Sequence, residues 1–364
     1  MKILSVEVCG VRNLKKQKIE FSPLLNVVRG KNAQGKTNLV EAIYFCAVSK
    51  SFRTSKEKEL VFCDQNGRAD GLKIKLNVQK KYTTQTIEII INSQGKKIVK
   101  VGGIAIKRIA DLFGQFNCVF FSPDELKLVK EAPADRRKFM DIDISQVSKH
   151  YFFLLLRYEK ILASRNKLLK QNSSSLKEQI DIYTQQLCDV GSKIILSRIN
   201  FLSKLSPYCS MAHSYLTNSA ESLEISYSGI TGTSSKEIAQ KMKQQLDENY
   251  EKDLALGFTS IGPHRDDIKI LLDKKDVRVF ASQGQQRTVA LSLKLAELEI
   301  IKDECGEMPV LVLDDVLSEL DHERQKKLVN FTQKAQTILT CNHFDLPNSN
   351  CQFFDVEDGV ISKK

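Results

Sequence analysis

The sequence contains no tryptophan and few prolines, and it has no long uninterrupted apolar run. Because a helix that spans a bilayer needs about 20 consecutive apolar residues, no membrane-spanning segment is expected. The start, MKILSVEV, alternates like a strand and lacks the apolar core of a signal peptide. We therefore expect a cytoplasmic protein that does not act in a membrane.

Paired cysteines are missing as well. Nine cysteines are scattered singly, with an odd total and no Cys-x-x-Cys pair. Disulfide scaffolds and zinc knuckles depend on such pairs and spacings. The expectation is reduced thiols, without disulfides or a zinc site.

What the chain does have is length and positive charge. Its 364 residues, 42% of them apolar, suffice for one large or two ordinary domains with buried cores. The net charge of +11 favours a polyanionic partner, which releases counterions on binding. The basic residues are spread along the chain, so the charge alone does not identify that partner.

Alternating apolar and polar residues in the first third of the chain predict short strands. These strands cover residues 3–8, 18–21, 25–28, 72–78, 86–91 and 117–121. Helical patterns follow Lys36 and cover residues 104–113.

From Pro133 to about Leu216, apolar residues recur every three to four positions, which indicates helices. Residues 171–175 interrupt this pattern, and Pro207 is expected to end or kink the second long helix. We predict two antiparallel helices that form an arm.

Strand and helix patterns alternate again beyond the arm. We predict a strand at 223–227, helices at 235–251 and 286–302, and strands at 310–313 and 337–339. The predicted fold is therefore α/β, with a head of two lobes formed by both chain ends and an inserted helical arm. The predicted boundaries are 1–132 for the first part of the head, 133–256 for the arm and 257–364 for the second part.

A P-loop, or Walker A motif, occupies residues 30–37, GKNAQGKT, between a predicted strand and a predicted helix. Such a loop turns its N–H groups toward phosphates, while Lys36 neutralises their charge and the Thr37 hydroxyl binds Mg²⁺. We therefore expect ATP and Mg²⁺ as ligands. The predicted nucleotide-binding residues of the loop are Gly30, Asn32, Gly35, Lys36, Thr37 and Asn38.

An apolar strand at 308–313 ends in Asp314 and Asp315, as the Walker B strand of a P-loop protein does. We assign Asp314 to the Mg²⁺ ion and Asp315 to the activation of water, with Lys36 as the third catalytic residue. Taken alone, the same pattern also fits a strand end whose carboxylates cap a helix.

A polar loop, SQGQQR at 282–287, opens the predicted helix 286–302 and suits an anion through Ser282, Gly284 and Gln285. Ordinary capping by Ser282 is the alternative. The order of Walker A, helical insertion, this loop, Walker B and SELD at 318–321 resembles the ABC-type ATPase heads of the SMC class. The resemblance implies that the signature loop of one head covers the ATP of a second head.

Further stretches resemble the RecF family within that class. They are VRNL at 11–14, KSFRT at 50–54, FSPDEL at 121–126, PADRRKFMD at 133–141 and GPHRDD at 262–267. The insertion is also too short for the coiled coils of SMC proteins. The resemblance implies an ATP-dependent homodimer that binds double-stranded, gapped or junction DNA and acts with RecR. It also implies an indirect partnership with RecO, RecA and SSB, in which the protein helps to load RecA onto strands coated by SSB. It further implies a weak DNA-stimulated ATPase with roles in repair, replication and the SOS response.

Three other basic or polar residues are assigned by resemblance. Arg12 and Asn13 are expected to reach the nucleotide, and Arg53 to face phosphate; solvated turns are the alternative for each. The sequence departs from the ABC pattern at His343, which stands one place late for a switch histidine, and after strand 117–121, where no Q-loop glutamine follows. His264 is expected to belong to a structural turn.

DNA contacts need only exposed basic residues, because readout of bases is not expected. Candidates are Lys80, Lys81, Lys96, Lys97, Lys107 and Arg108. A solvated charged face is the alternative. Two other functions remain open, a P-loop kinase of small molecules and a structural DNA clamp without hydrolysis.

Overall fold

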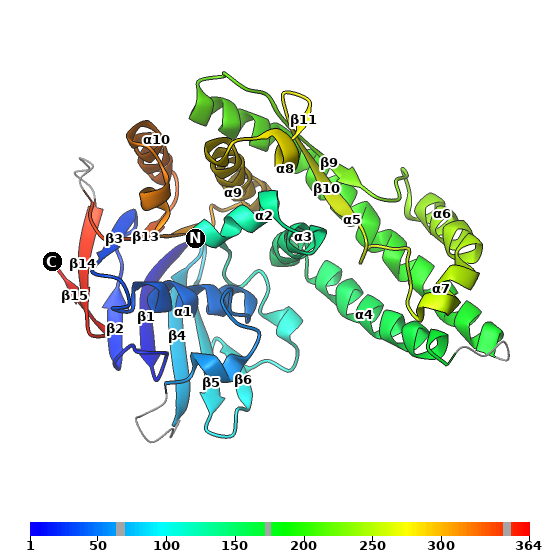
Figure 1. Ribbon diagram of the computed structural model, residues 1–364. Coiled ribbons are helices and arrows are strands. Elements are labelled where there is room, and N and C mark those ends of the chain that lie inside the picture. Colours follow the sequence, from blue (N-terminus) through cyan, green and yellow to red (C-terminus); the bar gives the residue numbers. More distant parts are fainter. Residues whose placement is uncertain (63–69, 172–175, 345–350) are drawn as a thin grey trace. The chain divides into compact units, whose positions relative to one another are not determined.

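The computed structural model describes residues 1–62, 70–171, 176–344 and 351–364 (Figure 1). The chain forms two compact units, which are described separately. Unit 1 combines Met1–Glu125 with Leu291–Lys364, and unit 2 is Leu126–Ala290. We predicted a return to the head at residue 257, whereas residues 257–290 group with the helical unit and the chain re-enters unit 1 inside α9 (Gln283–Cys305).

Unit 1 contains an antiparallel sheet with the strand order β2-β1-β4-β5-β6-β7. Its alternating sequences bury one side, as the pleat of a strand requires. Charged side chains on the other side pair across strands, for example Lys73 with Glu88 at 2.6 Å. The strands are β1 (Lys2–Cys9), β2 (Gln17–Glu20), β4 (Gly71–Gln79), β5 (Thr84–Asn92), β6 (Lys97–Val101) and β7 (Ile104–Ala105).

The second sheet of unit 1 has the order β15-β14-β3-β13-β12-β8 and is parallel except at β15. Its central strands are apolar and buried throughout, as expected for a parallel sheet covered on both faces. Their carboxyl ends lie at one edge, which is where such sheets bind ligands. The strands are β3 (Leu25–Arg29), β8 (Cys118–Phe121), β12 (Val310–Asp314), β13 (Thr337–Cys341), β14 (Cys351–Glu357) and β15 (Val360–Lys363).

Helix α1 (Lys36–Val48) contacts strands of both sheets. Almost all of its residues are buried, and its apolar residues are not confined to one face, as expected of a helix enclosed between layers. The amino end of α1 is therefore fixed at the edge where the parallel strands end. The other helical elements of unit 1 include η1 (Glu57–Leu60), η2 (Ile109–Asp111), η3 (Pro123–Leu126), η5 (Val316–Glu319) and α10 (His322–Thr332).

Unit 2 is mainly helical, with a small antiparallel sheet of order β11-β10-β9. The two long helices α4 and α5 pack along each other. The helices are α2 (Lys127–Lys130), α3 (Pro133–Val147), α4 (Lys149–Leu169), α5 (Lys177–Thr217), α6 (Ser235–Glu248), α7 (Tyr250–Leu256) and α8 (Val277–Phe280), and the strands are β9 (Leu223–Ser228), β10 (Asp267–Leu272) and β11 (Lys275–Asp276).

One prediction of local structure is wrong. Residues 104–113 were expected to be helical but form β7, a loop and the short turn η2. Pro207 was expected to end or kink the second long helix; it lies inside α5, which continues to Thr217, so it does not end the helix, and the kink stays a prediction. Four of the five residues predicted to break the arm, 172–175, lie outside the described residues. No helix in the described part of the chain is long and apolar enough to cross a membrane.

Candidate nucleotide-binding site

The P-loop joins β3 to α1 at the edge where the parallel strands end. Gly35 has φ 121°, a conformation that other residues rarely adopt, and it occupies the N-cap position of α1 without a side-chain cap. The first N–H groups of a helix have no partner within the helix. The amino end of α1 can therefore accept phosphate oxygens. The predicted residue Asn32 lies exposed in the loop, and Asn38 lies in the first turn of α1.

Lys36 is 6% exposed, and its ammonium group lies over the loop. It donates to the carbonyl oxygens of Gly30 and Lys31 and to Oδ1 of Asn342, the last at 2.8 Å. Burial lowers the pKa of Lys36, and the nearby Asp315 opposes this shift. The lysine thus supplies a partly desolvated positive charge at the mouth of the loop, where a phosphate would neutralise it.

Thr37 and Asp314 meet although 277 positions separate them in the sequence. The Thr37 hydroxyl lies 3.2 Å from Oδ1 of Asp314, which also accepts a hydrogen bond of 2.6 Å from Thr340. Burial raises the pKa of Asp314, and both hydroxyl donors lower it. A hydroxyl and a carboxylate oxygen at this distance are the ligand types that Mg²⁺ prefers. The residues present therefore fit a magnesium ion.

Asp315 follows β12 in the left-handed conformation, with φ 52°. Its N–H group donates to the carbonyl and hydroxyl oxygens of Thr340, which fixes the turn. It occupies the N-cap position of η5, yet its side chain makes no capping bond. The next helix, α10, is capped instead by Asp321. The Asp315 carboxylate is thus not used for capping, the alternative that the sequence had left open.

A second polar cluster adjoins the loop and contains the three residues assigned by resemblance. Arg12 makes two hydrogen bonds of 3.0 Å to Glu41, which is fully buried in α1. Arg53 donates to Asn38 at 2.9 Å, and Asn38 donates to Asn13 at 2.6 Å. The cluster places two guanidinium groups and two amides beside the amino end of α1.

Two further residues of this site were not predicted from the sequence. Glu41 holds Arg12 and also accepts from the Ser51 hydroxyl, so it organises the second cluster. A charged residue in an otherwise apolar stretch of helix was the available signal. Asn342 reaches Lys36 from the position after β13, whereas His343, the residue that the sequence had singled out, is exposed.

The predicted signature loop lies in unit 2, at the start of α9. Ser282 and Gln285 form a reciprocal capping box, with N–H to side-chain distances of 2.7 and 3.3 Å. Capping by Ser282, the alternative to anion binding, is thus present in this structure. Gln285 also donates to Glu221 at 2.8 Å, and Glu221 contacts the buried His213. At Gly284 a Cβ atom would meet nothing within 4 Å, so the loop surface is open there.

The six predicted DNA-binding residues differ in how their side chains are engaged. Lys97 is largely covered and contacts Glu57 and the carbonyl of Ser49. Lys80 donates to the carbonyl of Gly114 at 2.9 Å. The other four, Lys81, Lys96, Lys107 and Arg108, are exposed. The exposed four suit phosphate contact better than Lys97 does.

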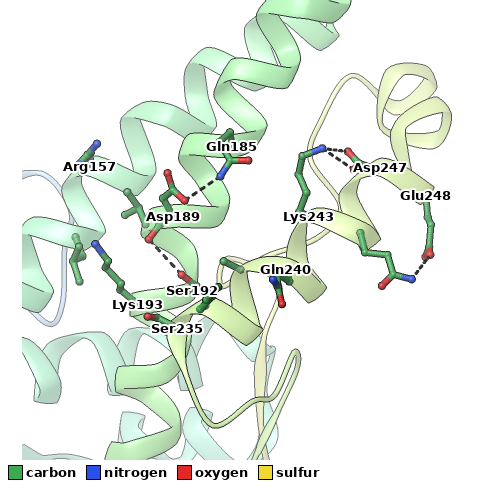
Figure 2. A pocket seen from close by; sticks show the side chains of 15 residues that line it. Arg157, Gln185, Asp189, Ser192, Lys193, Ser235, Gln240, Lys243, Asp247 and Glu248 are labelled. Carbon is green, nitrogen blue, oxygen red and sulfur yellow. Dashed lines mark hydrogen bonds and ion pairs between the residues drawn. The ribbon is translucent and has the colours of Figure 1, made fainter.

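A hollow of about 910 Å³ lies in unit 2 against α4, α5 and α6 (Figure 2). Its lining mixes charges of both signs, which pair locally, as Lys243 does with Asp247 at 2.6 Å. It contains none of the predicted site residues. The hollow is thus separate from the residues that the sequence assigns to the nucleotide.

The chain matches the RecF/RecN/SMC N terminal domain over residues 2–357. A DNA replication and repair protein RecF from Clostridium acetobutylicum is 42% identical over 342 residues, which cover 94% of this chain and 93% of that protein. The protein of the same description from Alkaliphilus oremlandii is 42% identical over 369 residues, with 99% and 100% covered.

Among solved structures, that of the recombination mediator protein RecF-ATP in the RecFOR pathway matches with a TM-score of 0.91 and 39% identity. The match covers 100% of this chain and 97% of that one. An SMC head bound to the C-winged helix domain of ScpA has a TM-score of 0.59 at 17% identity, covers 100% and 98% of the two chains, and shares the fold alone. The predicted fold class, an α/β ABC-type ATPase head, is confirmed.

Proposed function

This chain belongs to the RecF family, and we propose on that premise that it is an ATP-dependent DNA-binding protein of recombinational repair and replication-fork maintenance. The observation that carries the proposal is the meeting of Lys36, Thr37 and Asp314 at one edge of the parallel sheet. Relatives about 40% identical over nearly their whole length are described as DNA replication and repair proteins, and a solved relative is described with ATP.

In this proposal ATP binds with its phosphates at the P-loop and the amino end of α1. Thr37 and Asp314 hold Mg²⁺, which supplies positive charge to the phosphate oxygens. Lys36 exchanges Asn342 for phosphate oxygens, so the ammonium group keeps a partner in both states. Arg12 and Asn13 approach the nucleotide from the second cluster.

Hydrolysis is proposed to be slow in a single subunit. Asp315 orients the attacking water, and Lys36 stabilises the charge that develops on the phosphate. Ser282, Gly284 and Gln285 complete the site from a second copy of the chain. ATP thus favours the homodimer, and hydrolysis releases it, so the protein works as a switch.

DNA is proposed to bind to the ATP-bound dimer through phosphate contacts, with Lys81, Lys96, Lys107 and Arg108 as the first residues to test. Junctions of double and single strands are the proposed targets. By membership of the family, the proposed partner is RecR, and indirectly RecA, RecO and SSB. DNA is expected to stimulate the weak ATPase.

The test is the mass of the protein in solution, measured by light scattering with Mg²⁺ and either ATP or ADP. We expect the wild type to dimerise with ATP only, Lys36→Met and Ser282→Arg to stay monomeric, and Asp315→Asn to keep the dimer longer. Lys31→Met is the matched control, because Lys31 is an exposed lysine of the same loop, and it should behave as wild type. If the mass does not depend on the nucleotide in any variant, the switch is excluded. The remaining candidates are then a P-loop kinase of small molecules and a structural DNA clamp.

A further inference from the structure

The chain ends in a hairpin that the sequence analysis did not predict. Strands β14 and β15 pair with Glu357 opposite Val360, so the connection is the two residues Asp358 and Gly359. Their φ angles are 46° and 74°. Two left-handed residues in a two-residue connection correspond to a type I′ turn, for which Asp-Gly is a preferred sequence.

The tip of this hairpin is hydrogen-bonded to Gln34 of the P-loop. The N–H group of Gly359 donates to the carbonyl oxygen of Gln34 at 3.1 Å. The N–H group of Asp358 donates to the side-chain Oε1 of Gln34 at 2.6 Å. Gln34, which directly precedes Gly35, thus accepts hydrogen bonds from both N–H groups of the tip.

The same tip contacts the turn that carries Arg12 and Asn13. The carbonyl oxygen of Gly359 accepts from the N–H group of Lys15 at 3.0 Å and from Nε2 of Gln17 at 2.7 Å. A Cβ atom at Gly359 would lie only 2.0 Å from the carbonyl oxygen of Asn13. No side chain fits at that distance, so only glycine allows the tip and the turn to meet.

The turn and the P-loop also contact each other, which closes a triangle of three segments. Nδ2 of Asn13 donates to the carbonyl of Ala33 at 3.2 Å. Arg12 and Ala33 have φ angles of 50° and 64°, a left-handed conformation that is strained for residues other than glycine. Such conformations persist only where their surroundings hold them in place. At this junction the hairpin tip provides part of those surroundings.

We propose that the hairpin tip positions the nucleotide site, with Gly359 and Gln34 as its positioning residues. The tip holds the P-loop and the Arg12–Asn13 turn in the shape that receives phosphate, although the hairpin itself does not touch the nucleotide. This inference rests on the proposed function, since it assumes that ATP binds at the P-loop. It assigns to the C-terminal strands a role in ATP affinity.

The decisive variant is Gly359→Ala, and the chain offers a matched control for it. Gly306 has almost the same φ, 72°, but a Cβ atom there would meet nothing within 4 Å. Gly306→Ala therefore introduces the same backbone strain without the clash. For Gln34→Ala, the control is Gln352→Ala, because Gln352 lies on β14 and contacts Glu20 rather than the P-loop.

The measurements are the Kd values for a fluorescent ATP and a fluorescent ADP, the KM and kcat of ATP hydrolysis, and thermal unfolding without nucleotide. We expect Gly359→Ala to raise the Kd of both nucleotides at least about tenfold, and Gln34→Ala to raise it roughly two- to tenfold. KM should rise while kcat at saturating ATP is retained, because binding of substrate and transition state is lost equally. Both controls should bind as wild type does.

A folded Gly359→Ala protein with wild-type affinity for ATP would overturn the proposal. So would equal losses of affinity in Gly359→Ala and Gly306→Ala, since these would reflect strain alone. If Gly359→Ala does not fold, Gln34→Ala decides, and an unchanged Kd in that variant overturns the proposal. If the wild-type protein binds no ATP, the proposed function itself is contradicted. This result is distinguishable from a difference in affinity between the variants.

Discussion

At the scale of single residues, the loop before β10 holds a half-buried histidine and a buried aspartate whose pKa values move in opposite directions. Nε2 of His264 donates to the carbonyl oxygen of Thr259 at 3.0 Å, and Nδ1 of the neutral ring accepts from the Tyr158 hydroxyl at 2.8 Å. Burial lowers the pKa of His264 from 6.5 to about 4. Burial raises the pKa of Asp266 from 3.8 to about 6, although the Tyr227 hydroxyl donates to it. The fold thus keeps this histidine neutral and tolerates a protonated aspartate.

These shifts predict opposite dependences of stability on pH. The contribution of His264 is complete above pH 6.5 and is lost as the pH falls through about 4, because the unfolded chain binds the proton more tightly. The contribution of Asp266 is complete below pH 3.8 and is lost as the pH rises through about 6. Each is worth about 3 kcal/mol at its full extent. Between pH 4 and pH 6 the two largely cancel.

We therefore expect that substituting either residue exposes the effect of the other on the pH dependence of stability. Relative to wild type, the free energy of unfolding of His264→Gln should rise by up to about 3 kcal/mol as the pH falls from 6.5 to 4. The free energy of unfolding of Asp266→Asn, relative to wild type, should fall by a similar amount over the same interval. The reason is that this variant lacks the stability that Asp266 gains as the pH falls. Urea unfolding at several pH values measures both. Curves parallel to that of wild type would contradict the assignment.

The residues of the nucleotide site divide into those that the sequence could reveal and those that it could not. Lys36 and Thr37 were predictable because a P-loop requires fixed residue types at fixed spacing next to one strand and one helix. Asn342 was not, since its contact with Lys36 joins positions 306 apart and depends on the order of strands in the sheet. For Glu41 the sequence offers only the weak signal of a charge in an apolar stretch of helix, and its role follows from its burial beside Arg12.

At the scale of elements, α4 is tied to α7 by a buried ion pair. Arg165 donates to Asp253 at 2.8 Å, and both side chains are almost completely buried. The hydroxyls of Thr184 and Thr259 accept from the same guanidinium at 2.9 and 2.8 Å. Because water is excluded, each charge is compensated by the other and would be costly to leave unpaired.

We expect Arg165→Ala to lower the free energy of unfolding by about 3 to 5 kcal/mol, since it leaves the Asp253 carboxylate buried and unpaired. The double variant Arg165→Leu with Asp253→Leu should recover most of this loss, because apolar side chains need no partner. Lys243→Ala is the control, since its pair with Asp247 is largely exposed, and it should change stability by less than about 1 kcal/mol. Denaturant unfolding gives all three values, and a double variant no better than the single one would refute the explanation.

The spacing of apolar residues predicted the elements in which one periodicity is sustained over many residues. It did not predict elements whose conformation is determined by pairing with neighbouring strands. Helices α4 and α5 were predicted because their apolar residues recur every three to four positions over many turns. Residues 104–113 were misassigned because β7 is too short to show alternation and is fixed only by pairing with β6. The terminal hairpin was overlooked although Asp358-Gly359 between alternating residues is a strong hairpin signal.

At the scale of the whole molecule, the proposed mechanism divides each ATP site between two copies of the chain. Lys36 and Asp315 would act from one copy, and Ser282 from the other. In a closed twofold dimer every site then contains the Walker residues of one subunit and the signature loop of its partner. Defects in the two kinds of residue should therefore complement each other when subunits are mixed.

We expect an equal mixture of Lys36→Met and Ser282→Arg subunits to regain ATP hydrolysis that neither variant has alone. Because neither variant dimerises alone, the dimers in such a mixture pair one subunit of each kind. Each has one intact site and one site with both defects, so recovery approaches at most about half of the wild-type rate. A mixture of Lys36→Met and Asp315→Asn is the matched control and should recover nothing, because those defects fall on the same side of the site. Steady-state hydrolysis at saturating ATP measures both mixtures. Recovery in the control as well, or in neither mixture, would show that the two copies do not share their sites.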